Sequence, residues 1–386
     1  MSKNSPANPQ PSALPGDSLV PAKEQAQTLD PHLPPGIFST DQLDLFQTFL
    51  CNVGEKDKLS NAIDLWDSVP RYSISQLEMN KRRTADGFLG LLEIKFKYRG
   101  LAFRAVIQPA RIRESDGQVL DYYPSANEEL VEDILRKIAA ERLQGFHDTA
   151  NSKVGVYFSL YQIQSELKKR GHSRSIGEIK RSLEIMAKSS IEIKSLDGKG
   201  NEGTRVSNYL PDMVSVSRED LQADPYSQWM VEFHPLVTKS IIEATYRQFD
   251  LDKLLSMSTQ LGRWVHRQLV IKYTFASLMT PFEIRYSTIK RDSFMINYGR
   301  ERAGIAALDQ VMNELKEKNI IMDFQRHVTS GARRKILDVV YSLTPSLEFI
   351  KEAKSANKRK TLAQEKLASG DNKSGDEPEL GEPIQT

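Results

Sequence analysis

The apolar positions of the chain follow the same pattern twice, once in residues 174–195 and once in residues 300–324. In each stretch four apolar side chains recur at offsets 0, 3, 7 and 10, which is the spacing of one face of an amphipathic helix. These positions are Ile176, Ile179, Leu183 and Met186 in the first stretch and Ile305, Leu308, Met312 and Leu315 in the second. Five residues after the last position of each set, an apolar run predicts a strand. The two stretches therefore form an internal repeat of a helix followed by a strand.

The sequence around the two helices repeats as well. Each helix is preceded by a strand that ends at a serine, and each following strand leads into a polar, Gly-containing turn and a returning strand. In the first copy, Ser159 is a good N-cap for a helix over 160–170, which ends at Gly171. The expected strands are Val154–Phe158, Ile191–Lys194 and Thr204–Tyr209 in the first copy, and Phe282–Tyr286, Ile320–Phe324 and Lys335–Leu343 in the second. This order is that of a winged helix, a helix-turn-helix with a β-hairpin attached, and two copies account for residues 150–345.

Further elements are predicted before and between the two copies. Before the first copy we expect a strand over 92–98, a turn, a strand over 103–107, and a helix that starts at Ser125 or Asn127. The apolar stripe of that helix is Leu130, Ile134, Leu135 and Ile138. Between the copies we expect a strand over 229–233, a helix begun by Pro235 and a long helix over 251–274. The apolar side of the long helix is Leu254, Met257, Leu261, Trp264, Val265 and Leu269.

The two ends of the chain differ in composition from the middle. Residues 1–36 hold eight of the 18 prolines and few large apolar groups, so they cannot bury enough surface to offset their ordering entropy. Residues 355–386 are rich in Lys, Ser, Gly and Glu and are predicted to be a frayed tail. The predicted fold is α+β, with tandem winged-helix domains between disordered tails. The expected parts are a disordered arm 1–36, a linker 37–87, a first winged-helix domain 88–218, a second winged-helix domain 219–345, and a C-terminal helix end with a disordered tail 346–386.

The composition is that of a globular chain able to bury sizeable cores. Of the 386 residues, 39% are apolar and 27% are charged. No window approaches the ~18 uninterrupted apolar residues that span a bilayer, and the polar N-terminus lacks the apolar run of a secretory signal. One cysteine, Cys51, excludes an intramolecular disulfide framework and a multi-Cys metal site. These features predict a protein of the reducing cytoplasm without a membrane partner.

The modest net charge of +2 hides two basic blocks. Residues 153–218 carry 12 basic and 7 acidic side chains, and residues 287–343 carry 10 and 7. Basic blocks of this kind bind a polyanion such as nucleic acid when their charges share a face.

The sequence shows no catalytic constellation. The string Gly198–Gly203 matches a dinucleotide-binding glycine pattern, but it lies between two strands, whereas that pattern requires a helix after it. The sequence contains no Walker A string and no Gly-x-Ser-x-Gly elbow, and its six histidines are not at metal-ligand spacing. We therefore expect no enzymatic activity, no cofactor and no metal.

The second helix of each copy has the residues expected of a recognition helix, which places its N-terminal side chains at base edges in the major groove. Arg grips guanine O6 and N7 in bidentate fashion, whereas Lys more often neutralises phosphate. The candidates on the two helices are Arg174, Ser175, Lys180, Arg181, Arg300 and Arg302. The candidates at a helix end or a hairpin tip are Lys168, Lys169, Arg170, Lys199, Arg333, Arg334 and Lys335. The alternative is that these charges are solvated faces and that one winged helix is a dimerisation module.

A separate motif lies upstream of the repeats. Residues 42–46 fit the Gln-Leu-x-Leu-Phe pattern of peptides that dock on the bacterial sliding clamp, with Gln42, Leu43, Leu45 and Phe46 as the matching residues. Leu and Phe fill an apolar pocket in this interaction, and Gln fixes the orientation of the peptide. The alternative is a short helix start after Thr40 and Asp41 that buries Leu45 and Phe46 within the chain.

Residues 90–343, about two thirds of the chain, resemble the replication initiators of theta-replicating, iteron-bearing bacterial plasmids, which are built as tandem winged helices. The stretches similar to the broad-host-range IncP initiator are Arg111–Glu114, Glu129–Val131, Val156–Ile163 and Ile179–Leu183, and that initiator also has a Gln-Leu-x-Leu-Phe peptide upstream. The stretches similar to the inter-domain region of the IncP and IncQ initiators are Phe233–Leu236 and Leu261–Arg267.

The resemblance implies binding of directly repeated origin DNA, opening of an AT-rich region, and recruitment of the host helicase or its loader and of the polymerase machinery. It also implies a homodimer that represses its own promoter and a monomer that initiates, which together control plasmid copy number. Two other functions stay open. One is a winged-helix transcriptional repressor without a role in initiation. The other is a nickase-type initiator, which needs a catalytic tyrosine near a histidine cluster; Tyr122 and Tyr123 are present, but the His-x-His neighbourhood is missing.

Overall fold

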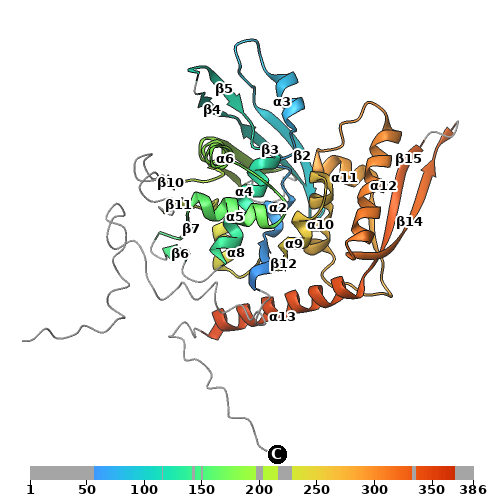
Figure 1. Cartoon of the computed structure of the whole chain (residues 1–386). Helices are drawn as coiled ribbons and strands as arrows, with labels where there is room; N and C mark the ends of the chain where they lie inside the picture. Colours follow the sequence, from blue (N-terminus) through green and yellow to red (C-terminus); the bar gives the residue numbers. More distant parts are fainter. Residues whose placement is uncertain are drawn as a thin grey trace, which may run out of the picture. The chain divides into compact units, whose positions relative to one another are not determined.

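The computed structural model describes residues 56–114, 116–140, 144–148, 151–196, 203–215, 228–332 and 336–369 (Figure 1). A short 3-10 helix, Lys56–Lys58, precedes the first strand. The helices are α2 Asp64–Ser68, α3 Gln76–Arg82, α4 Ala126–Ala139, α5 Leu160–Lys169, α6 Ile176–Lys188, α8 Pro235–Ile242, α9 Leu251–Leu255, α10 Gln260–Lys272, α11 Tyr286–Ser293, α12 Glu301–Glu317 and α13 Leu347–Ser369. The strands are β1 Leu59–Ala62, β2 Leu92–Tyr98, β3 Leu101–Gln108, β4 Ala110–Arg113, β5 Val119–Tyr122, β6 Gly145–Asp148, β7 Lys153–Phe158, β8 Ser190–Ser195, β9 Thr204–Asn208, β10 Met213–Val214, β11 Trp229–Glu232, β12 Arg247–Asp250, β13 Phe282–Arg285, β14 Ile321–Ser330 and β15 Ile336–Pro345.

The first predicted unit is present as β7, α5, α6, β8 and β9, in the predicted order. Ser175 starts α6 with a capping box: its hydroxyl accepts from the Glu178 amide, and the Glu178 carboxylate accepts from the Ser175 amide. Along the predicted stripe Ile179, Leu183 and Met186 are fully buried, and Ile176 packs against the same core. The helix and its orientation are therefore confirmed.

The second unit is present as β13, α11, α12, β14 and β15. All four apolar positions of its predicted stripe, Ile305 to Leu315, are buried. A Cβ at Gly304 of α12 would lie 2.4 Å from the Tyr286 hydroxyl and 2.8 Å from an Ile296 methyl group. A larger residue here would therefore have to displace these two buried side chains.

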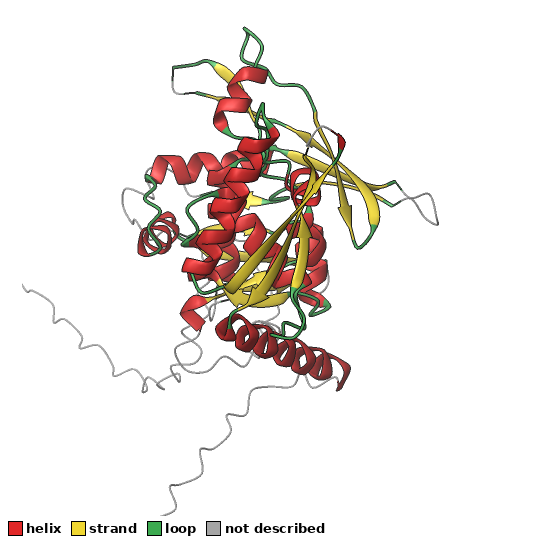
Figure 2. Ribbon diagram, turned by 90° about the vertical axis from the view of Figure 1, so that its right-hand side faces the viewer, coloured by secondary structure: helices red, strands yellow, loops and turns green. Residues whose placement is uncertain are grey.

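The strand pairing distinguishes the two units. In the second unit β13 pairs with β15, which pairs with β14, so the leading strand and the hairpin form one sheet. In the first unit the hairpin β8–β9 instead extends the hairpin β2–β3 into a four-stranded sheet, while β7 pairs with β6 and β11 in another sheet. Gly155 of β7 permits this second arrangement, because a Cβ there would collide with the Val231 carbonyl and the Phe146 ring. Figure 2 shows the two hairpin-containing sheets.

The prediction that residues 37–87 are a linker is wrong for residues 59–82. This segment folds as β1, α2 and α3, and β1 pairs with β12, nearly 190 residues later in the chain. Ile63, Trp66, Ile74 and Met79 are each 1–2% exposed. The apolar residues are spaced irregularly along the segment, so no single helix or strand period reveals their burial.

The predicted long helix over 251–274 is two helices, α9 and α10, separated by residues 256–259. The Thr259 hydroxyl accepts from the Gly262 amide and caps α10, and the Ser258 amide donates to Glu314 of α12 at 2.6 Å. The residues predicted for the apolar side nevertheless lie in the core, and Met257 is buried although it belongs to the connecting turn. A serine and a threonine that bond to neighbouring backbone or acids end one helix and begin the next.

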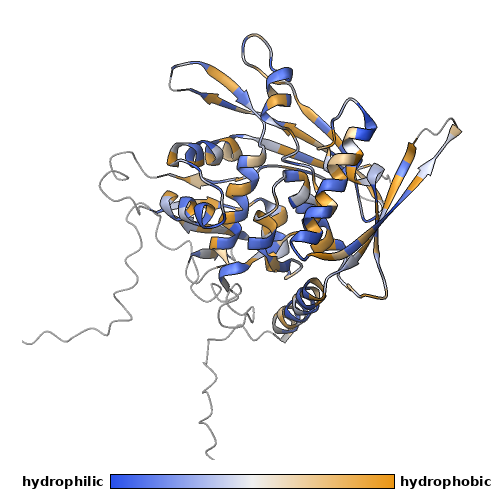
Figure 3. Ribbon diagram, turned by 45° about the vertical axis from the view of Figure 1, so that its right-hand side comes forward, coloured by the Kyte–Doolittle hydropathy of each residue, from blue (hydrophilic) through white to orange (hydrophobic). Residues whose placement is uncertain are grey.

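The tail predicted from residue 355 is also wrong as far as residue 369. Helix α13 runs from Leu347 to Ser369 and lies along β12 (Figure 1). Its buried residues are Phe349, Ala353, Ala356 and Ala363, at offsets that keep them on one face. Figure 3 shows apolar and polar positions mixed along this helix. The composition of this segment, small apolar residues among many lysines, is typical of a tail. The spacing of its apolar residues, however, is that of a helix.

A buried network of charges joins α4, α10 and the segment after β1. Its members are four acids and four arginines, each 1–5% exposed: Asp67, Glu129, Glu132, Asp133, Arg71, Arg136, Arg263 and Arg267. Asp67 is the centre of the network, because its carboxylate accepts from Arg136 at 2.8 Å, from Arg71 at 2.9 Å and from Arg267 at 3.4 Å. Since α10 leads directly to the second unit, the network links that unit to the first.

Two acids of the network keep their charges although they are buried, whereas burial outweighs the effects of Arg267 and Arg136 on Asp133 and raises its pKa. Burial raises the pKa of Asp67, but the positive charges of Arg136, Arg267 and Arg71 outweigh this effect and hold the pKa far below its usual range. The same balance lowers the pKa of Glu132 to about 2: burial raises it, and Arg71 and Arg136 lower it by more. Both acids are therefore ionised at neutral pH.

We expect Asp67→Asn to destabilise the protein by about 3–5 kcal/mol, because removal of one buried partner leaves the facing guanidinium groups without a counter-charge. The matched control is Glu78→Gln, which removes an ion pair with Lys81 at the surface and should leave the unfolding midpoint close to that of the parent chain. Urea unfolding followed by circular dichroism measures both. Equal midpoints for the two variants would contradict a central role for Asp67.

Candidate nucleic-acid interface

The exposed face of α12 carries side chains suited to reading base edges. Opposite the buried stripe, Arg302, Ala306, Gln310 and Asn313 follow at helical spacing, and all four are exposed. Arg pairs with guanine, Gln and Asn pair with adenine, and Ala contacts the thymine methyl group. Arg300 lies at the N-cap of the helix and is exposed as well.

The acids near this face are held by neighbouring groups. Glu301 accepts from the Lys290 ammonium and from the Tyr286 hydroxyl, and these hydrogen bonds lower its pKa. Asp309 accepts from Arg326 of β14 at 2.6 Å and from the Tyr341 hydroxyl at 2.7 Å. In contrast, the guanidinium groups of Arg300 and Arg302 make no hydrogen bond or ion pair with any described residue. The start of α12 therefore presents unpaired positive charge.

The β14–β15 hairpin extends beyond the sheet to which it belongs. Leading strand β13 pairs with residues 340–343 of β15, so the distal part of the hairpin, from Val328↔Val339 onward, is two-stranded. Residues 325–330 of β14 are all exposed. A two-stranded ribbon of this kind, next to a helix with exposed polar side chains, has the form of the wing of a DNA-binding winged helix.

Helix α6 of the first unit differs, because most of its predicted contact residues are bonded to the protein. Arg174 donates to Asn127 Oδ1 at 2.9 Å, and the Ser175 hydroxyl belongs to the capping box. Arg181 forms an ion pair with Glu114 and lies 4.4 Å from the centroid of the Tyr122 ring. Lys180 is exposed, with its ammonium 5.8 Å from the Trp229 ring centroid.

Arg170 is not a DNA contact. Its side chain is 2% exposed and forms ion pairs with Glu166 and, at 2.8 Å, with Asp252. The neighbouring Lys168 and Lys169 are exposed. The basic string at the end of α5 thus divides into two solvent-facing lysines and one arginine that holds α5 to α9.

Several predicted residues lie outside the part of the chain that the structure describes. These are Gln42, Leu43, Leu45 and Phe46 of the clamp-like peptide and Lys199, Arg333, Arg334 and Lys335 of the hairpin tips. Their roles stay predictions. The described residues on either side of the tips belong to the paired strands β8, β9, β14 and β15, as the winged-helix pattern requires.

The described residues provide neither an exposed tyrosine pair nor a metal-binding cluster for a nickase-type site. Tyr122 and Tyr123, the tyrosines of a nickase-type site, are buried, and their hydroxyls donate to Glu114 and to the Gly90 carbonyl. Among the described residues, no group of three or more His, Cys, Asp or Glu side chains could hold a metal ion. Within the same ranges, no helix combines the length and apolar character needed to cross a bilayer.

The sequence prediction did not identify Ala306, Gln310 and Asn313. The signal was available, since these residues follow Arg302 on the side of the helix opposite the predicted apolar stripe. These three side chains are uncharged, so the two basic blocks of the sequence do not indicate them.

No protein-family model matches the chain, and no curated protein matches it. Solved structures with a similar arrangement are two crystal structures of domains 2 and 3 of RctB. One has a TM-score of 0.43 and 11% identity and covers 66% of this chain and 91% of that one; the other has 0.42 and 9% and covers 71% and 94%. A third is the crystal structure of the Pi initiator protein in complex with iteron DNA, with a TM-score of 0.31 and 14% identity, covering 76% of this chain and 99% of that one. Each TM-score lies below 0.5, so a function for this chain has to follow from its own residues.

We expect Gln310→Ala and Asn313→Ala each to cost about 1–3 kcal/mol in binding to a duplex selected from a random DNA pool, and to relax base preference at one position. The matched control is Gln76→Ala, an exposed glutamine on α3 outside both winged units. Fluorescence anisotropy on the selected duplex and on its single-base variants measures both effects. If the α12 variants bind every duplex like the control, this face does not read bases.

Proposed function

We propose that the chain is a plasmid replication initiator that binds directly repeated origin DNA through two winged helices. The observation that carries the proposal is the presence of two winged-helix units in one chain, with base-reading side chains exposed on α12 beside a protruding hairpin. Two major-groove insertions cover about two turns of duplex, which corresponds to a repeat of roughly 20 base pairs. The likeness to a Pi initiator bound to iteron DNA agrees with this assignment without carrying it.

The contacts of α10 with both units favour one composite site over two independent ones. Helix α10 packs against α11 and α12 and takes part in the buried network with α4. A fixed spacing between two reading heads requires a fixed spacing between two half-sites in the same orientation. Deforming DNA to fit both heads costs on the order of a few kcal/mol, which would assist the melting of adjacent AT-rich DNA.

The second candidate is a transcriptional repressor without a role in initiation. The bonding of Arg174 and Arg181 to protein groups favours the repressor, because these bonds leave the first unit with fewer free base-reading groups than the second. Under this alternative the first unit is a dimerisation module, and the bound DNA is an inverted repeat read by two copies of the second unit.

A footprint on the DNA that flanks the gene distinguishes the two functions. We expect the purified full chain to protect an array of direct repeats spaced by about two helical turns. Protection of a single inverted repeat, with no direct repeats, would overturn the initiator assignment and support the repressor.

Recruitment of host replication proteins is the remaining part of the proposal. The Gln42–Phe46 peptide would dock on the sliding clamp, and a separate surface would bind the replicative helicase or its loader. We expect Leu45→Ala with Phe46→Ala to abolish plasmid maintenance while the footprint on the flanking DNA stays unchanged. The control is Leu43→Ala with Gln42 retained, which should have a smaller effect. Normal maintenance of a plasmid encoding the double variant would remove the clamp from the proposal.

A further inference from the structure

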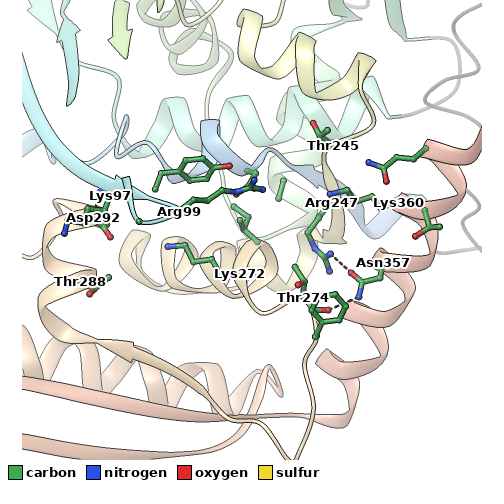
Figure 4. Close-up of a pocket in the computed structure, with 18 of the residues that line it drawn as sticks. Lys97, Arg99, Thr245, Arg247, Lys272, Thr274, Thr288, Asp292, Asn357 and Lys360 are labelled. Carbon is green, nitrogen blue, oxygen red and sulfur yellow. Dashed lines mark hydrogen bonds and ion pairs between the residues drawn. The ribbon is translucent and has the colours of Figure 1, made fainter. Parts of the chain in front are cut away.

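A cationic pocket lies on a side of the molecule that the DNA-binding proposal does not use. It has a volume of about 810 Å³ and lies between the β2–β3 turn, β12, the end of α10, α11 and α13 (Figure 4). None of the described residues of α12, β8, β9, β14 or β15 contributes to its lining. Its volume is in the range of pockets that enclose a small molecule.

The pocket has more positive charge than its own acids can neutralise. Two aspartates line it, and each is already paired with an arginine: Asp64 with Arg99, and Asp292 with Arg291 at 2.7 Å. Four further cations line the pocket and form no ion pair with an acid of the described residues: Lys97, Arg247, Lys272 and Lys360. They come from β2, β12, α10 and α13, so four separate elements direct positive charge toward one volume (Figure 4).

The uncompensated cations also have unused hydrogen-bond donors. Arg247 is 8% exposed; it donates to Asn357 Oδ1 at 2.5 Å and to a backbone carbonyl, but its Nε–H has no partner. The ammonium groups of Lys272 and Lys360 bond to none of the described residues. The Nε–H of Arg247 is thus a buried donor without a partner, and a ligand with acceptor oxygens would satisfy it.

The local electrostatics leave the lysines short of negative charge. Burial lowers the pKa of Lys360, Arg247 and Arg99 lower it further, and the opposing effect of Asp64 does not restore it. Burial likewise lowers the pKa of Lys272 by more than Asp292 and Asp64 raise it. A bound anion would oppose these shifts by adding negative charge.

The lining has a second feature that narrows the class of ligand. Phe275 lines the pocket and is 86% exposed, an unusual placement for an aromatic ring. Its open face can stack on a planar base, as aromatic side chains do in nucleotide sites. The combination of four converging cations and a free ring fits phosphates at one end of a ligand and a base at the other.

We propose that this pocket binds a free nucleoside polyphosphate, with the phosphates among Arg247, Lys272 and Lys360 and the base against Phe275. The site is independent of the proposed function, since none of the described candidates for DNA contact lines it. A concave volume lined from four elements holds a compact ligand, whereas a duplex backbone follows an extended surface.

Calorimetric titration of the full chain at 150 mM salt tests the proposal, with ATP, inorganic pyrophosphate and adenosine as probes. We expect ATP and pyrophosphate to bind and adenosine not to bind. Lys272→Gln and Lys360→Gln should each weaken ATP at least tenfold, and Phe275→Ala should weaken ATP but leave pyrophosphate unchanged. The matched control is Lys354→Gln, an exposed lysine of α13 that does not line the pocket and should bind ATP like the parent chain.

Three results would overturn the proposal. One is the absence of binding by both ATP and pyrophosphate in protein whose melting curve is that of a folded chain. Another is equal weakening by Lys354→Gln, which would indicate diffuse surface charge. The last is displacement of ATP by a random duplex together with a tenfold loss of duplex affinity in Lys272→Gln, which would assign the pocket to the DNA backbone.

Discussion

The carboxylate of Asp67 is the point on which the arrangement of the two units depends. Arginines from the segment after α2, from α4 and from α10 converge on it, and the four acids and four arginines of the surrounding network balance in number. A buried ion pair adds little net stability compared with well-packed apolar groups, but breaking one is costly because an unpaired charge stays behind. The network therefore favours the observed arrangement because another arrangement of the units would leave a buried charge unpaired. Any shift of α10 relative to α4 would separate Arg267 from Asp133, which lie 2.6 Å apart, so the helix that leads into the second unit has one favoured position.

That constraint explains which parts of the fold the sequence predicts. The two winged helices are visible because each rests on local periodicity, a stripe at Ile176–Met186 or Ile305–Leu315, to which the first unit adds the capping serine Ser175. The contacts between them are nonlocal. Nothing near β1 indicates that it pairs with β12, and nothing near Asp67 indicates that its partners lie 69 and 200 residues away. A charged side chain in a short, irregular segment is typical of a surface position. Its burial is possible here only because the folded chain brings arginines from other elements next to it.

The candidate interface divides in the same way. The sequence places Arg300 and Arg302 correctly on an exposed helix start, since that inference needs only the phase of one helix. It treats Arg174 and Arg181 as equivalent to them, but Asn127 and Glu114 hold these two side chains, and both partners belong to elements that precede the repeat. The two copies are thus alike in backbone order and different in chemistry. In the second unit Arg300 and Arg302 are free, whereas in the first Arg174 and Arg181 hold α6 to α4 and to the β4–β5 hairpin. Under the proposed function the two helices therefore offer different groups to DNA: α12 presents free polar side chains, whereas α6 presents mainly Lys180.

The same distinction shows why a count of basic residues is a weak guide to function in this chain. Arginine and lysine occur in three settings. Some are buried in an ion pair, as Arg136; some are exposed without an ion pair, as Arg302; and some line a pocket without an ion pair, as Lys360. An acid neutralises the charge in the first setting. A long polyanion can reach the charge in the second, and a compact anion fits beside it in the third. The two basic blocks of the sequence contain the second setting, but Arg247, Lys272 and Lys360 all lie outside them. Four cations that are far apart in sequence produce no local excess of charge, and they acquire a common role because β2, β12, α10 and α13 meet around one volume. For this reason we infer the pocket from the fold, and no reading of local charge along the chain leads to it.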